Sequence, residues 1–131
     1  MILGTGIDII EIYRIERVVN KRDNFLDRFF TLGEKEYFST NGKVKMESVA
    51  GYFAAKEAVT KSIGTGFTGI LWKDVEIQKS SLGQPQVVLK GKAKEEAEKL
   101  GVKDILLSIS HCREYAIAQA IAIGRDTIKD V

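Results

Sequence analysis

The feature that most constrains this 131-residue chain is a run of alternating alanines in its last third. Ala116, Ala118, Ala120 and Ala122 alternate with larger residues, and a period of two is the period of a β-strand. All four alanines are therefore expected on one face of a strand over residues 115–123. Because methyl groups fill little space, this face predicts a helix or another subunit packed closely against the sheet.

The other elements are predicted from hydrophobic periodicity and turn residues. Residues 2–10 are apolar on both faces, which predicts a central strand. Residues 48–63 form a long apolar helix that ends at Gly64, and residues 11–30 have helical spacing with a break expected near Asp23. The remaining predicted elements are short, with helices at 34–40 and 93–100 and strands at 74–78, 86–89 and 104–110. The pattern indicates one α+β domain over residues 1–131, an antiparallel sheet packed against helices.

Charge and composition exclude several classes of protein. The formal net charge of +2 is too small for a typical nucleic-acid-binding protein. Charged residues interrupt the apolar runs before they could span a bilayer, and the N-terminal residues lack the features of a signal peptide, so we expect a cytoplasmic protein. The single cysteine and single histidine cannot build a Cys/His zinc site. A bound metal would need mainly oxygen ligands, which favours Mg²⁺.

Asp8 is out of place in the first predicted strand, because aspartate is depleted in strands. By period-two counting it shares a face with Gly4 and Gly6, whose missing side chains would leave room for a bulky ligand. The alternative is that the strand ends at Ile7 and that Asp8 caps the following helix. The residues alone leave both interpretations open.

Glu57 is a second exceptional residue, a carboxylate on a helix that is apolar around most of its circumference. A buried carboxylate needs a partner, since leaving it unpaired costs free energy. Lys61, one turn later, would supply an ordinary ion pair. The other interpretation is that Glu57 and Asp8 share one divalent cation, with Lys61 beside them.

His111 is the only histidine, and it follows Ser110 at the end of the predicted strand 104–110. A lone histidine in such a place is either a hydrogen-bonded structural residue or a group that presents an N–H to a phosphate. The neighbouring Cys112 is expected to be an inert thiol, because nothing in the sequence indicates a lowered pKa.

A basic stripe follows the first predicted strand, provided that residues 11–30 form a nearly continuous helix. Five residues then fall on one side of that helix, namely Arg14, Arg17, Lys21, Phe25 and Arg28. A solvated amphipathic surface is the ordinary explanation of such a pattern. A basic stripe that contains an apolar residue also suits an acidic partner helix.

Three of these motifs, in this order and at these spacings, resemble the signature of the holo-acyl-carrier-protein synthases. They are Gly6-Ile7-Asp8, the FAAKEA segment at 53–58 with Lys61, and Ser110-His111. The resemblance covers nearly the whole chain and includes Arg14 and the turn at 83–85. It implies a Mg²⁺-dependent transfer of 4'-phosphopantetheine from coenzyme A to a serine of apo acyl carrier protein. That reaction releases adenosine 3',5'-bisphosphate and supports fatty acid biosynthesis.

The resemblance implies a catalytic role for three residues. Asp8 and Glu57 match the two carboxylates that ligate Mg²⁺, and Lys61 matches the lysine beside the reacting phosphate. Two carboxylates suit Mg²⁺, which usually fills its other positions with water and phosphate. The acceptor of the serine proton is left open between Glu57 acting through a water and that water itself.

Coenzyme A and the carrier protein are assigned to other segments by the same resemblance. Ser110 and His111 match a motif that contacts the coenzyme A phosphates, and Gly83 and Pro85 match a turn near the adenine. The basic stripe that begins at Arg14 matches the surface that receives an acidic helix of the carrier protein. The family is typically a homotrimer with active sites between subunits, so a homotrimer is expected here.

One position departs from the family's pattern. Many members carry arginine just before the phenylalanine of the central motif, where it can reach a phosphate, and this sequence has Tyr52. The 3'-phosphate of coenzyme A would then depend on other basic groups, such as Lys43, Lys45 or Lys79.

Two other functions fit part of the pattern. A coenzyme A-binding module without activity leaves both carboxylates without a purpose, and a metal-dependent phosphohydrolase does not explain the basic stripe.

Overall fold

The computed structural model describes residues 1–125. Its main sheet has three antiparallel strands in the order β1-β7-β6, where β1 is Ile2–Glu11, β6 is Val102–His111 and β7 is Tyr115–Gly124. Two small hairpins complete the strands, β2 Ser39–Thr40 with β3 Lys43–Val44 and β4 Val75–Lys79 with β5 Pro85–Leu89. The helices are α1 Ile12–Lys21, α2 Phe25–Phe29, α3 Leu32–Phe38, α4 Met46–Ser62, α5 Gly91–Lys99 and the short 3₁₀ helix η1 Trp72–Asp74.

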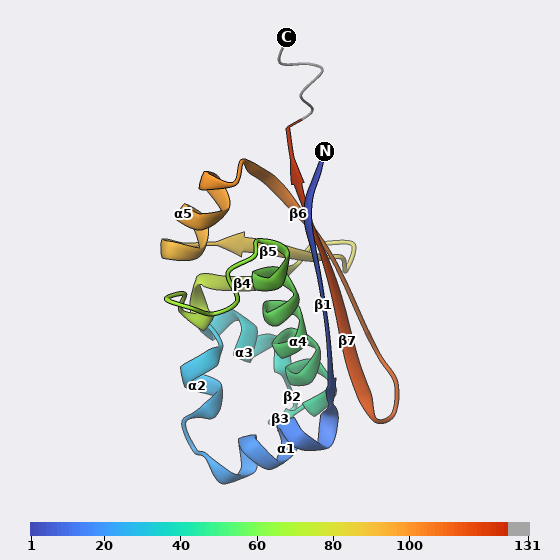
Figure 1. Ribbon diagram of the computed structural model, residues 1–131. Helices are drawn as coiled ribbons and strands as arrows, with labels where there is room; N and C mark the ends of the chain where they lie inside the picture. The colour runs from blue at the N-terminus through green and yellow to red at the C-terminus, as the bar shows by residue number, and fades with distance from the viewer. Residues whose placement is uncertain (126–131) are drawn as a thin grey trace.

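The alanine face of β7 is covered by the long helix α4, which packs across the three-stranded sheet (Figure 1). Ala116, Ala118, Ala120 and Ala122 are all buried. The alternation therefore predicted the strand and its close packing, and the partner on this face is a helix of the same chain. None of the helices in residues 1–125 has the length and hydropathy needed to cross a bilayer.

The glycines of β1 bring this strand unusually close to α4. A Cβ added to Gly4 would collide with the carbonyl oxygen of Ser62, and a Cβ added to Gly6 would collide with that of Ala58. The expectation that these two glycines leave room for a ligand is wrong, because the backbone of α4 occupies that space. Their missing side chains instead set the distance between strand and helix.

The opposite face of the sheet has no helix or strand against it within residues 1–125 (Figure 1). Ile7 is 57% exposed and Ile9 is 60% exposed on this face, and Ile9 lies opposite Ile117 of β7. The prediction that residues 2–10 form a central strand is wrong for the single chain, since β1 is an edge strand and β7 is central. The strand is apolar on both faces although only one of them is covered.

A buried ion pair fixes α4 relative to the helices and strands around it. The ammonium of Lys56 donates to Glu34 Oε1 at 2.8 Å and to the carbonyl oxygens of Phe29 and Trp72 at 3.0 and 2.9 Å. The second oxygen of Glu34 accepts from the backbone N–H of Ile77 at 2.8 Å. Both side chains of the pair are fully buried. Because each is supplied with several partners, the pair joins α4 to α2, α3, η1 and β4.

Candidate active site

Asp8 and Glu57 face the same cavity, which has a volume of about 340 Å³. Its walls come from β1, α1, α2 and α4, and the residues that line it are Asp8, Ile9, Ile10, Arg14, Ile15, Val18, Phe25, Phe53 and Glu57. The cavity is therefore lined by six apolar residues, two carboxylates and one guanidinium. Two residues that are 49 positions apart in the sequence thus meet at one site.

Asp8 lies inside β1, opposite Ala118 of β7. Its Oδ1 accepts a hydrogen bond from Lys61 Nζ at 3.1 Å, and the same ammonium donates to the carbonyl oxygen of Ile7 at 3.0 Å. The N-cap of α1 is Glu11, and no side chain caps that helix. The interpretation of Asp8 as a helix cap is therefore wrong. Lys61 forms its ion pair with Asp8, where an ordinary pair with Glu57 was the alternative.

Glu57 has no ion-pair partner within 4.0 Å in the described part of the chain. Burial raises the pKa of Glu57, the charge of Asp8 raises it further, and Lys61 partly offsets both effects. The guanidinium of Arg14 at this cavity is paired with Glu11, so Asp8 and Glu57 share the one ammonium of Lys61 and an excess of negative charge remains beside them. Such a site attracts a cation and also contains a carboxylate that is more basic than usual.

The donor set fits a hard divalent cation that keeps few protein ligands. No group of three or more His, Cys, Asp or Glu side chains converges within residues 1–125. Zn²⁺ sites need three or four protein ligands, whereas Mg²⁺ is commonly held by one or two carboxylates together with waters and substrate phosphates. Asp8 and Glu57 therefore suit Mg²⁺ delivered with a phosphate-bearing substrate.

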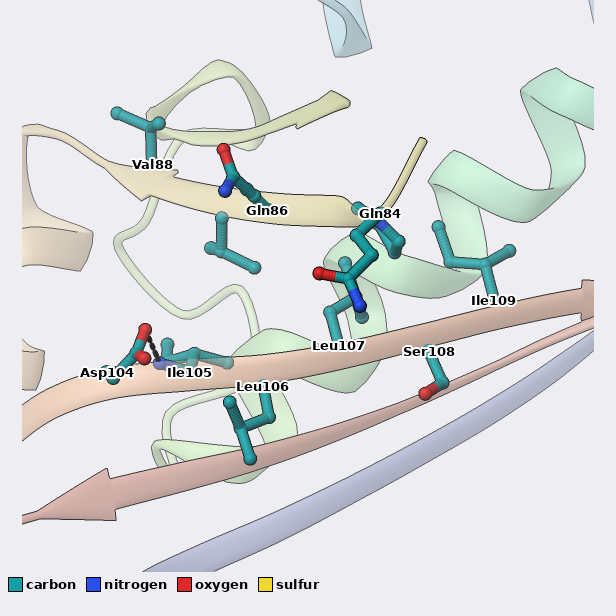
Figure 2. Close-up of a pocket in the computed structure, with 11 residues that line it drawn as sticks. Gln84, Gln86, Val88, Asp104, Ile105, Leu106, Leu107, Ser108 and Ile109 are labelled. Atoms are coloured by element: carbon teal, nitrogen blue, oxygen red, sulfur yellow. Dashed lines mark hydrogen bonds between the residues drawn. The ribbon is translucent and has the colours of Figure 1, made fainter. Parts of the chain in front are cut away.

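A second cavity, of about 670 Å³, lies between β5 and β6 (Figure 2). Leu107 and Ile109 project from β6 toward β5, while Ser108 projects to the other side of the strand. Gln84 and Pro85 line the cavity at the start of β5. The turn before them contains Gly83, whose φ of +84° is a conformation that favours glycine.

Ser110 and His111 lie at the end of β6, and both are exposed. His111 pairs with Ala116 of β7 and lines neither of these two cavities. Because β7 separates β6 from β1, His111 and Asp8 lie on opposite edges of the sheet. A single chain therefore brings Asp8, Glu57 and Lys61 together but does not bring His111 to them.

The basic stripe is only partly formed, because the helix predicted over residues 11–30 breaks at 22–24 into α1 and α2. Arg14, Arg17 and Lys21 are exposed on α1, and Arg28 is exposed on α2. Phe25 is only 6% exposed and packs against other aromatic rings of the core. The single stripe with Phe25 on its surface is therefore wrong. Arg14 and Phe25 nevertheless line the cavity that contains Asp8.

Tyr52 is buried and stacks on Tyr37, with ring centroids 5.0 Å apart and planes 8° from parallel. Burial raises the pKa of Tyr52, so the phenol is neutral and cannot replace the charge of an arginine. Lys79 Nζ lies 5.3 Å from the centroid of the Tyr37 ring. Among the three lysines considered from the sequence, Lys79 thus contacts this tyrosine pair, whereas Lys43 and Lys45 are exposed on and after β3.

Sequence reasoning gave no role to two residues of α4, one at the cavity and one in the core. Phe53, one turn before Glu57, forms part of the apolar wall and stacks on Trp72 with ring centroids 4.8 Å apart. Lys56 precedes Glu57 and points into the core instead of the cavity. The available signal was a lysine among the apolar residues of a buried helix, where an unpaired charge would be destabilising.

Comparison with known proteins identifies the family. Residues 4–120 match the family model described as the 4'-phosphopantetheinyl transferase superfamily. The chain belongs to this superfamily. It is 51% identical over 123 residues to the holo-[acyl-carrier-protein] synthase of Alkaliphilus oremlandii, across 94% of this chain and 100% of the relative. It is 53% identical over 130 residues to the synthase of the same name from Clostridium kluyveri, across 99% of this chain and 96% of the relative.

Solved structures of the superfamily share the fold. The holo-ACP-synthase from Plasmodium yoelii has a TM-score of 0.85 and 37% identity, covering 96% of this chain and 98% of that one. The synthase of Helicobacter pylori in complex with coenzyme A has a TM-score of 0.80 and 33% identity, covering 91% and 99%. The α+β fold predicted from the sequence is confirmed.

Proposed function

We propose that this chain is a cytoplasmic holo-acyl-carrier-protein synthase, which transfers 4'-phosphopantetheine from coenzyme A to a serine of apo acyl carrier protein with the help of Mg²⁺. The observation that carries the proposal is the convergence of Asp8 and Glu57 at one cavity, with Lys61 hydrogen-bonded to Asp8. The site occurs in a chain whose relatives are named as synthases of this kind, one of them crystallised with coenzyme A.

In the proposed reaction, the serine oxygen bonds to the phosphorus that carries pantetheine, and the phosphoanhydride bond breaks. The electron pair of that bond leaves with adenosine 3',5'-bisphosphate. Mg²⁺ held by Asp8 and Glu57 would neutralise charge on the pyrophosphate when bound. Lys61, beside Asp8, would neutralise further charge on the transferring phosphate. Glu57 would accept the serine proton through a water.

Coenzyme A is proposed to bind at the β5–β6 edge of a chain. The cavity beside Gly83 and Pro85 is large enough for part of a nucleotide, and Ser110 and His111 end the strand that forms its other wall. A ring N–H of His111 would donate to a phosphate. Lys79 is paired with Pro85 across the hairpin and would add positive charge there.

The assembly is proposed to be a homotrimer with active sites between subunits. Two features support an assembly that joins unlike edges of neighbouring chains. Asp8 and His111 lie on opposite edges of one sheet, so a complete site would take one edge from each of two chains. Ile7, Ile9 and Ile117 are exposed on the uncovered face, where an apolar surface favours contact with another copy.

The carrier protein is proposed to dock on the exposed basic residues of α1 and α2, beside the cavity that contains Asp8. Arg14, Arg17, Lys21 and Arg28 would steer an acidic helix toward the site. Phe25 would act as part of the cavity wall, because it is buried and cannot present its ring on the surface.

Intact-mass spectrometry of an apo acyl carrier protein tests the function. Incubation with this protein, coenzyme A and Mg²⁺ should add the mass of one phosphopantetheine, and EDTA should prevent the gain. Asp8→Asn and Glu57→Gln should lose the activity, whereas Glu95→Gln on the exposed side of α5 should keep it. Release of the bisphosphate without a carrier protein would indicate a phosphohydrolase instead. Coenzyme A binding without turnover would indicate a binding module.

A further inference from the structure

Lys61 occupies the place where a cation would neutralise Asp8. Its ammonium lies between Asp8 Oδ1, at 3.1 Å, and the carbonyl oxygen of Ile7, at 3.0 Å. Both acceptors belong to β1, so the side chain crosses from α4 to the strand. The side chain of Asp8 is 19% exposed and that of Lys61 is 48% exposed. A partly buried carboxylate is thus neutralised by a lysine that can still move into solvent.

The charges around this pair do not balance. Glu57 faces the same cavity and has no ion-pair partner in the described part of the chain, and Arg14 is paired with Glu11, so one ammonium serves two carboxylates. A divalent cation held by both carboxylates would balance them. A cation on either oxygen of Asp8 would lie next to the ammonium of Lys61 and would be repelled by it. The lysine and the metal therefore cannot both occupy this end of the cavity without cost.

We propose that Lys61 is a built-in counter-ion of Asp8 that competes with the divalent cation, so that the metal and coenzyme A bind cooperatively. The inference rests on the proposed function, since it takes Asp8 and Glu57 as the metal-binding carboxylates. The pyrophosphate of coenzyme A supplies metal ligands and also a new partner for the displaced ammonium. Coenzyme A thus lowers the cost of removing Lys61 from Asp8, and by linkage the metal strengthens coenzyme A binding equally.

A general effect of positive charge must be separated from competition at Asp8. Arg14 provides the matched control, because it lines the same cavity and carries the same charge. It lies 3.4 Å from Glu11 and forms no hydrogen bond with Asp8. Arg14→Met therefore removes one charge from the cavity while the contact between Lys61 and Asp8 remains.

The test is a titration with Mn²⁺, a paramagnetic probe of Mg²⁺ sites, followed by electron paramagnetic resonance with and without coenzyme A. Without coenzyme A, Lys61→Met should bind Mn²⁺ about three- to fivefold more tightly than wild type, the range expected for a partly exposed ion pair. Arg14→Met should change the Mn²⁺ affinity by less than about twofold, because solvent screens a more distant charge. The gain in Mn²⁺ affinity caused by coenzyme A should be smaller in Lys61→Met than in wild type.

Lys61→Gln serves as a second variant, and circular dichroism checks that each variant is folded. Equal Mn²⁺ affinities of wild type and both Lys61 variants would overturn the inference. An increase in Mn²⁺ affinity that is the same in Lys61→Met and Arg14→Met would overturn it as well. In either case Mn²⁺ binding promoted by coenzyme A would leave the proposed function standing. Absence of Mn²⁺ binding to the wild-type protein, even with coenzyme A, would overturn the metal assignment and the inference with it.

Discussion

Replacement of Gly6 with alanine should disturb the fold and the active site together. The added Cβ would collide with the carbonyl oxygen of Ala58 and would lie 2.9 Å from Lys61 Cβ. Carbon atoms that are not bonded settle about 3.5–4.0 Å apart, so β1 and α4 would have to separate by about 1 Å. The obstacle is helix backbone, which cannot swing aside as a flexible side chain can.

The expected loss of stability for Gly6→Ala is about 3 kcal/mol, the upper end of the usual cost of overpacking. For a chain of this size that corresponds to a fall in Tm of about 10 °C. The separation also moves Asp8, two residues further along β1, away from Lys61 and Glu57 on α4. A displacement of about 1 Å among catalytic groups can reduce turnover by about 100-fold.

Thermal unfolding by circular dichroism and the rate of carrier-protein modification by intact mass measure the two effects. Gly33→Ala in α3 is the control, because its nearest neighbour would be Glu76 Oε2 at an ordinary 3.6 Å. Alanine in a helix should be neutral or stabilising by up to about 1 kcal/mol there. Wild-type Tm and turnover in Gly6→Ala would refute the argument that contact with α4 requires glycine in β1.

Three further changes test other parts of the structure. Glu57→Gln should abolish transfer but raise Tm by about 2–4 °C at neutral pH, because burial and Asp8 raise the pKa of Glu57 and its ionised form is costly in the folded state. The gain should vanish as the pH falls toward about 4, where the wild-type carboxyl is also protonated, and a gain that does not depend on pH would contradict this cause. Lys56→Met should lower the free energy of unfolding by about 3–5 kcal/mol in urea denaturation, because Glu34 would keep a buried charge without its partner; a loss below 1 kcal/mol would exclude that role. Ile9→Glu should yield folded monomers in sedimentation velocity, whereas Leu82→Glu on an exposed turn should leave the assembly intact, and identical behaviour of the two variants would count against the uncovered face as the interface.

Most of the helices and strands could be predicted from the sequence because their signals are local, whereas the short hairpin β2–β3 and η1 were not predicted. Alternating alanines, Gly64 after α4 and the break before Phe25 each depend on neighbouring residues. The position of β1 in the sheet could not be predicted in the same way. A run that is apolar on both faces indicates that both faces of the strand are buried. It does not show whether the second face packs against the same chain or against another copy.

The errors at the site arise from tertiary packing. Gly4 and Gly6 were expected to make room for a ligand, but α4 fills that room, and no local pattern shows which element will approach a glycine. Phe25 was placed on a surface stripe because the helical wheel continued through the break before α2. The meeting of Asp8 with Glu57 was one of two open interpretations, since residues distant in sequence are brought together only by the packing of β1 on α4.

The strand order also determines when Asp8 acquires its surroundings during protein synthesis. β1 is translated first, but within residues 1–125 its only partner in the main sheet is β7, the last of the three strands to be made. Until residues 115–124 have left the ribosome, β1 has no strand with which to pair, and such long-range pairing slows folding. A nascent chain that ends before β7 would contain Asp8, Glu57 and Lys61 and still lack the sheet that holds them in place.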